Sequence, residues 1–204
     1  MIQTAAVEIA AILQFWFGTR ADDATVAKDQ AKLWWSKSTE LDDEIRDRFG
    51  SAVRSAASGE LNDWLATARG RLALIILTDQ FPRNIYRDTA RAFSFDPKAL
   101  VWCLEGLNRR VDIELRPIER VFFYLPLEHA ESRQYQQQSV ECFSRLSAAV
   151  PLEQKSVFED YLNFALRHRE ITERFGRFPH RNRILEREST LEELAFLSEP
   201  GSSF

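Results

Sequence analysis

The hydrophobic pattern of the chain contains one unusually continuous segment. Residues Leu72–Leu77 include no polar side chain, so a helix formed by them is stable only when protein surrounds it on every side. The chain then changes abruptly from apolar to mostly polar. The residues that follow include Asp79, Gln80, Phe81, Pro82, Arg83, Asn84 and Arg87. This pattern predicts a buried helix that ends at Pro82 and delivers a mostly charged cluster to one place in the fold.

Elsewhere, apolar residues recur at the spacing of amphipathic helices. One such segment places Leu41, Ile45, Phe49 and Val53 on a single face, and Gly59 is suited to end it. The predicted helices cover residues 4–17, 23–35, 40–58, 97–107, 117–125, 127–147, 151–176 and 191–197, with caps at Asp22 or Asp23, Thr39, Asp96, and Thr190 with Glu193. Pro126 is expected to bend or break the helix that starts at Pro117. No segment shows strand alternation, so we predict a single all-α domain over residues 1–204, built from stacked antiparallel helix hairpins.

The composition of the chain indicates which partners and which cellular compartment to expect. The formal net charge of −4 gives no reason to expect a nucleic-acid or anionic-membrane partner. No window approaches eighteen apolar residues, and the N-terminus lacks the pattern of a signal peptide. Cys103 and Cys142 lie among apolar residues without CxxC spacing, which is typical of buried, reduced thiols. A soluble cytoplasmic protein is therefore expected.

Several long motifs resemble a bacterial family catalogued as domain of unknown function 924. They are FWFG (15–18), GRLALIILTDQFPRNIYR (70–87), YLPLEHAES (124–132), RHREITERFGRFPHRN (167–182), and EREST (186–190) with the final PGSSF. The likeness runs from about Ile12 to Phe204. It implies an all-helical fold similar to tetratricopeptide repeats, and a glycine in a turn at the position where this chain has Glu186. It implies no activity, because no chemistry is assigned to the family.

Of the three histidines, His168 is predicted on the apolar face of its helix, in line with Tyr161, Phe164 and Ile171. One interpretation is a core histidine that is hydrogen-bonded and neutral. The other is a general base at the floor of a pocket, with a pKa lowered by burial.

His129 is flanked by Glu128 and Glu131 just after Pro126. Helical steps back from Val140 reach His129, so the inner face of the predicted helix 127–147 turns polar toward its start. Buried polar groups need partners, which favours a site at this position. The alternative is an exposed helix start, where the glutamates interact with the positive end of the helix dipole.

Two similar segments carry arginine and asparagine after Phe-Pro, namely Phe81–Asn84 and Phe178–Asn182. The candidate ligand-binding residues are Arg83, Asn84, Arg87, Arg177, His180, Arg181 and Asn182. Their guanidinium groups can hold a carboxylate or a phosphate, or they can pair with the acidic side chains of neighbouring helices. We expect the two segments to meet in space, with His129 and Glu131 between or beside them.

Three functional hypotheses follow from these residues. The first is a binding module for a small anionic ligand or an acidic peptide end. The second is a hydrolase-type enzyme that uses His129 or His168 as base, with Glu128 or Glu131 as partner and arginines that bind the substrate anion. The third is an ion-pair cluster with a purely structural role. No metal or cofactor is predicted, since Glu-x-x-His pairs, HExxH and Gly-rich phosphate loops are absent from the sequence. The oligomeric state is left open.

Overall fold

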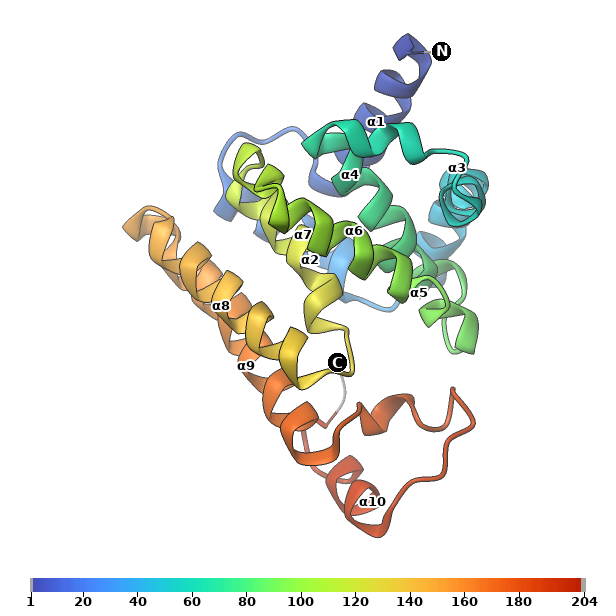
Figure 1. The fold of residues 1–204 in the computed structure, drawn as a ribbon, viewed down its shortest axis with the longest axis vertical. Helices are drawn as coiled ribbons and strands as arrows, with labels where there is room; N and C mark the ends of the chain where they lie inside the picture. Colours follow the sequence, from blue (N-terminus) through green and yellow to red (C-terminus); the bar gives the residue numbers. More distant parts are fainter. Residues whose placement is uncertain (1, 203–204) are drawn as a thin grey trace.

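In the computed structural model, the backbone of residues 2–202 and the side chains of residues 5–202 are described, and this part of the chain is helical without strands (Figure 1). The α-helices are α1 (Ile2–Phe17), α2 (Asp23–Trp35), α3 (Thr39–Ser58), α4 (Ala68–Ile75), α5 (Phe81–Ile85), α6 (Asp96–Asn108), α7 (Pro117–Glu128), α8 (Arg133–Ala149), α9 (Lys155–Phe175) and α10 (Leu191–Leu197). Shorter turns are η1 (Asn62–Ala66), η2 (Ile76–Gln80), η3 (Ala90–Phe93), η4 (Val111–Glu114), η5 (Leu152–Gln154) and η6 (Pro179–Arg181). The all-α prediction is confirmed.

The continuous apolar segment lies in the middle of the fold. Each of Leu72 to Leu77 is 0% exposed. The segment runs through α4 into η2, and α1, α3, α6 and α7 pack around these two elements. A helix with no polar face has therefore found protein on all sides, as its sequence requires.

Pro82 does not end this buried path, so the predicted helix end is wrong. The turn η2 is a π-helix, in which the N–H of Phe81 donates to the carbonyl of Ile76 five residues earlier. The wider turn places Pro82 in the first turn of α5. Backbone N–H groups of a first turn have no partner within the helix, so proline loses no hydrogen bond there. The chain can thus stay helical while its side chains change from apolar to charged.

The position of His129 also differs from the prediction. Pro126 lies inside α7, which continues to Glu128, and α8 begins only at Arg133. His129 is therefore the C-cap of α7 and not part of the start of α8. This excludes the helix-dipole interpretation for Glu128, because a C-terminus carries the negative end, whereas Glu131 directly precedes Ser132, the N-cap of α8, and so lies at the positive end of that helix.

Local capping signals in the sequence are mostly correct. Asp22 caps α2 by accepting from the N–H of Thr25, and Thr190 and Glu193 form the predicted capping box. For α3 the cap is Ser38 instead of Thr39. Asp96 opens α6 without capping it, and its carboxylate is used elsewhere. Glu186 has a φ of 54°, in the left-handed region that favours glycine, which agrees with the glycine expected there.

The C-terminal third of the chain forms a separate layer beside these central helices. The long helices α8 and α9 run side by side as an antiparallel hairpin (Figure 1). After Gly176 the chain turns through η6, so that Phe178–Asn182 approach the C-terminal end of α7. This return places the second Phe-Pro segment close to the first.

The cysteines and the hydrophobic character of the helices agree with what the composition indicates. Cys103 and Cys142 are both buried free thiols, and burial raises the pKa of each. Among the helices of the described residues, none has the length and apolar character needed to cross a membrane.

Candidate functional site

Charged side chains from distant parts of the sequence meet at the end of the buried helical path. Asp79 comes from η2, Arg83 from α5, Asp96 from the start of α6, and His129 from the end of α7. Glu131 and Arg181 approach from the segments before α8 and within η6. We call this set the central cluster: Asp79, Arg83, Asp96, His129, Glu131 and Arg181.

A histidine–aspartate pair lies within the central cluster. Nδ1 of His129 is 2.8 Å from Oδ1 of Asp79, which is fully buried. Burial by itself would raise the pKa of Asp79, but the charge of Arg83 and the contacts with His129 and Gln80 lower it below its ordinary value. Because a carboxylate only accepts, Nδ1 of His129 carries the hydrogen and Nε2 carries the lone pair. Burial and the Arg83 charge lower the pKa of His129, so its ring is neutral at pH 7.

The two arginines of the Phe-Pro segments share one carboxylate. Arg83 makes two hydrogen bonds to Asp96, at 2.9 and 3.0 Å, and also donates to the carbonyl of Asp79. Nη1 of Arg181 is 3.7 Å from Oδ2 of the same Asp96 and donates to the carbonyl of His129 at 3.1 Å. The expectation that these segments meet beside His129 is confirmed.

A cavity of about 460 Å³ opens beside His129. Asp96, His129, Glu131 and Arg181 line it, together with side chains of η3 and the starts of α6 and α8. This volume is in the range of small-molecule sites in proteins. We call it the His129 cavity.

Arg181 is the least neutralised arginine of the cluster. Its residue is 7% exposed and its Nε has no hydrogen-bond partner in the part of the chain that the structure describes. Burial and the nearby charge of Arg83 lower the pKa of the Arg181 guanidinium to about 10. The guanidinium carbon also lies 4.7 Å from the ring centres of both Phe93 and Phe178. A buried guanidinium whose charge is only partly neutralised would gain from an anion in the adjoining cavity.

A second, more deeply buried pair lies behind His129. Oε1 of Glu128 is 3.1 Å from Nδ1 of His168, which is also 2.9 Å from the carbonyl of Phe164. Burial raises the pKa of Glu128 to about 8, helped by the charge of Asp79, and burial lowers the pKa of His168 to about 3. Both groups are therefore neutral at pH 7, and the contact between them is not an ion pair. The rings of His129 and His168 are 6.5 Å apart.

Glu131 holds the returning C-terminal segment. It accepts from the N–H of Phe178 at 2.8 Å and from two nitrogens of Arg187 at 2.6 and 2.9 Å. Arg187 also donates to the side chain of Asn182 at 3.0 Å. These contacts make Glu131 a positioning residue for η6 and hence for Arg181. They fit a structural role for Glu131 better than that of a base.

Several predicted ligand-binding residues lie away from the His129 cavity. Asn84 and Arg87 both bind Asp42 of α3, at distances of 2.6–2.9 Å. Arg177 makes two hydrogen bonds to Glu193 of α10, at 2.6 and 2.8 Å. The amide of Asn182 donates to Ser189 at 3.0 Å. These four residues tie helices and loops together.

His180 lies next to the central cluster but does not line the cavity. Its ring is 5.7 Å from that of Phe178, and burial together with the charge of Arg181 lowers the pKa of His180 to about 4.

Sequence reasoning missed the most important partners. The sequence predicts Asp96 only as a helix cap, and it gives no sign of the roles of Arg187 and Asp42. Their roles have no local signal, because each partner lies at least thirteen residues away in sequence. A metal centre has no support within residues 5–202, where no three His, Cys, Asp or Glu side chains come together as possible ligands.

Comparison with known proteins places the chain among proteins without assigned activity. Residues 12–201 match the family model described as bacterial protein of unknown function (DUF924). Among solved structures, the protein of unknown function ATU0120 from Agrobacterium tumefaciens is 40% identical, with a TM-score of 0.80 over 95% of this chain and 98% of that chain. A search of the curated proteins gave no match.

Proposed function

The chain belongs to the bacterial DUF924 family, and we propose that it is an enzyme that uses His129 as a general base on a small anionic substrate. The observation that carries the proposal is the 2.8 Å contact between His129 Nδ1 and buried Asp79 at the wall of the His129 cavity. The reaction class that suits this arrangement is hydrolysis of an ester or a related bond.

The pair has the features that a base needs. His129 is neutral at pH 7 and has its lone pair on Nε2, as argued above. When Nε2 takes a proton, the ring becomes an imidazolium whose charge Asp79 stabilises, as the aspartate does in serine hydrolases. Asp79 can do this because Arg83 and Gln80 hold it in its ionised form. The same contact fixes the orientation of the ring.

The attacking group in this proposal is water. Within the described residues no serine, threonine or cysteine side chain hydrogen-bonds the His129 ring, so the ring has no protein nucleophile to activate. His129 takes a proton from water, the resulting hydroxide adds to the substrate carbonyl, and the imidazolium returns the proton to the leaving oxygen. The proton balance closes on His129 alone.

Arg181 supplies the contact for the substrate anion. Arg181 lines the same cavity as the histidine, and its nearest carboxylate contact is the 3.7 Å approach of Nη1 to Asp96. Both carboxylate oxygens of Asp96 accept hydrogen bonds from Arg83, and Arg181 is farther away, at 3.7 Å. Asp96 therefore neutralises Arg181 only in part, and the remaining positive charge can attract an anionic ligand.

The test compares wild type with His129→Gln and Asp79→Asn on chromogenic esters that carry a carboxylate or phosphate group. We expect His129→Gln to reduce kcat/KM at least 100-fold, since a positioned base contributes about 10²–10⁴-fold. Asp79→Asn should lower kcat with little change in KM, because it alters the tautomer and not the cavity. The control is Glu153→Gln on an exposed site. Equal turnover by wild type and His129→Gln would contradict the proposal.

A second candidate is binding of an anion without turnover, favoured by the only partly neutralised charge of Arg181. At constant ionic strength, phosphate or sulfate should raise the melting temperature more than chloride does, since ligands that bind only the native state stabilise it. Arg181→Gln should remove this difference, whereas Arg54→Gln on the exposed face of α3 should keep it. The same anion response in Arg181→Gln would indicate a general salt effect.

Combining the two experiments distinguishes the enzyme from the binding module. Anion-dependent stabilisation that needs Arg181, together with no reaction that depends on His129, would favour a binding module. If neither is found, the central cluster has a structural role. Its carboxylates Asp79, Asp96 and Glu131 already lie within ion-pair distance of Arg83, Arg181 and the neighbouring Arg187.

A further inference from the structure

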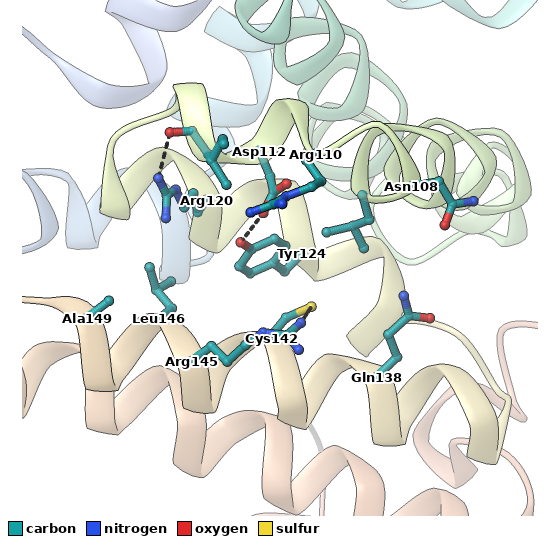
Figure 2. Close-up of a pocket in the computed structure, with 12 residues that line it drawn as sticks. Asn108, Arg110, Asp112, Arg120, Tyr124, Gln138, Cys142, Arg145, Leu146 and Ala149 are labelled. Atoms are coloured by element: carbon teal, nitrogen blue, oxygen red, sulfur yellow. Dashed lines mark hydrogen bonds between the residues drawn. The ribbon is translucent and has the colours of Figure 1, made fainter.

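A second cavity lies between α6, η4, α7 and α8, and it shares no lining residue with the His129 cavity. Its volume is about 470 Å³. Figure 2 shows that Tyr124 projects from α7 into its centre, with Arg110 on one side and Arg145 of α8 on the other. We call it the Tyr124 cavity.

The charge of the Tyr124 cavity is strongly unbalanced. Three arginines line it, Arg110, Arg120 and Arg145, against the single carboxylate of Asp112. One oxygen of Asp112 already accepts from the hydroxyl of Tyr124 at 2.7 Å. None of the three arginines forms an ion pair with a carboxylate among the side chains of residues 5–202. The central cluster differs in this respect, since both of its arginines lie within ion-pair distance of a carboxylate.

One of the three guanidinium groups, that of Arg120, is held in place by the protein. Arg120 donates to the carbonyls of Ile113 and Leu115, at 2.8 and 3.0 Å. Arg145 donates to Sγ of buried Cys142 at 3.4 Å, a weak contact that leaves most of its donors unused. Arg110 and Arg145 are exposed, so a ligand can reach both guanidinium groups, and the ordered Arg120 lies in the same lining.

Arg110 reaches the cavity from an unfavourable backbone conformation. Its φ of 57° and ψ of 31° are left-handed, at the turn just after α6. This position normally favours glycine, because a side chain costs roughly 1–2 kcal/mol there. Left-handed residues other than glycine often mark functional positions. Figure 2 shows the Arg110 side chain lying beside the hydrogen bond between Asp112 and Tyr124.

Apolar side chains complete the lining. Leu107, Ile113 and Leu146 face the same space, and Ile113 is 55% exposed. An inorganic anion would leave this surface unused. A ligand with an anionic head and an apolar body would contact both parts.

We propose that the Tyr124 cavity binds an organic monoanion or dianion with a carboxylate or phosphate head, held by Arg110 and Arg145, and a small apolar body against Leu107, Ile113 and Leu146. The site is separate from the His129 cavity and does not depend on the activity proposed there.

The experiment measures binding of phenylacetate and phenyl phosphate by titration calorimetry, with neutral 2-phenylethanol and inorganic phosphate as comparison ligands. Wild type should bind at least one of the two aromatic anions in a saturable, one-to-one manner. The tighter of the two identifies the head group. Both comparison ligands should bind at least tenfold more weakly, since each lacks one of the two parts.

The sharpest variant is Arg110→Gly, because glycine suits the left-handed backbone and should keep or raise the melting temperature while it removes the guanidinium. We expect Arg110→Gly and Arg145→Gln each to weaken binding at least tenfold. Arg109→Gln, an exposed neighbour that does not line the cavity, and Arg181→Gln should bind like wild type.

Three results would overturn the proposal. The first is no saturable binding of either aromatic anion, and the second is wild-type affinity in both Arg110→Gly and Arg145→Gln. The third is loss of binding in Arg181→Gln, which would place the ligand in the His129 cavity.

Discussion

Replacing Leu74 with alanine should lower the free energy of unfolding by about 2–5 kcal/mol. Leu74 lies in α4 and is 0% exposed, with helices packed on all sides, so the structure cannot easily close the space left behind. Ile75→Ala should have a similar effect for the same reason. Urea titrations followed by circular dichroism would measure both.

The matched control is Leu152→Ala, which deletes the same atoms from a side chain that is 81% exposed. Surface substitutions of this kind usually change stability by less than about 0.5 kcal/mol. A loss below about 1 kcal/mol at both Leu74 and Ile75 would show that the buried segment is not the centre of the core.

Glu128→Gln should be more stable than wild type, and the difference in the free energy of unfolding should grow as the pH rises from 4.5 to 8. Burial raises the pKa of Glu128 from 4.5 to about 8. Between these values the folded protein holds a proton that the unfolded chain releases, so stability falls as the pH rises. The loss amounts to about 1.4 kcal/mol per pH unit, up to roughly 5 kcal/mol at pH 8 and above. Glutamine has a similar shape and no charge, so the variant avoids this loss.

The measurement is the free energy of unfolding of both proteins at pH 4.5, 6, 7 and 8.5. The difference between them should be small at pH 4.5 and largest at pH 8.5. Glu153→Gln, at an exposed position, serves as the control and should show no such trend. A constant difference across the range would mean that Glu128 ionises normally in the folded protein.

The pKa values of Glu128 and Asp79 illustrate how environment separates two buried carboxyl groups. Asp79 has Arg83, His129 and Gln80 around it and stays ionised. Glu128 is buried beside the neutral His168 and near the charge of Asp79, so its pKa is raised to about 8 and it keeps its proton at pH 7. Active sites often contain carboxyl groups whose pKa values are pushed apart in this way. The sequence shows both acids but gives no sign of this difference.

The candidate site could be predicted in part. A helix face that turns polar indicates His129, although this residue in fact ends α7, and the two similar Phe-Pro segments indicate Arg83 and Arg181. Glu131 lies beside them as expected, and it holds the segment of η6 through Phe178 and Arg187. Arg87 and Arg177 carry the same chemical groups but bind Asp42 and Glu193. Residue type alone does not separate an arginine that lines a cavity from one that ties two helices together.

The sequence by itself determined the helices and the burial of the segment from Leu72 to Leu77. These features depend on periodicity, capping residues and the absence of polar atoms, which are properties of neighbouring residues. Only the tertiary structure decided that Pro82 is accommodated by a π-turn, that His129 ends α7, and that Asp79 is its partner. The physical reason is that hydrogen bonds and ion pairs act over a few ångströms between groups that can lie fifty or more residues apart in the chain. Their partners are therefore set by how the helices pack, and no local pattern records that.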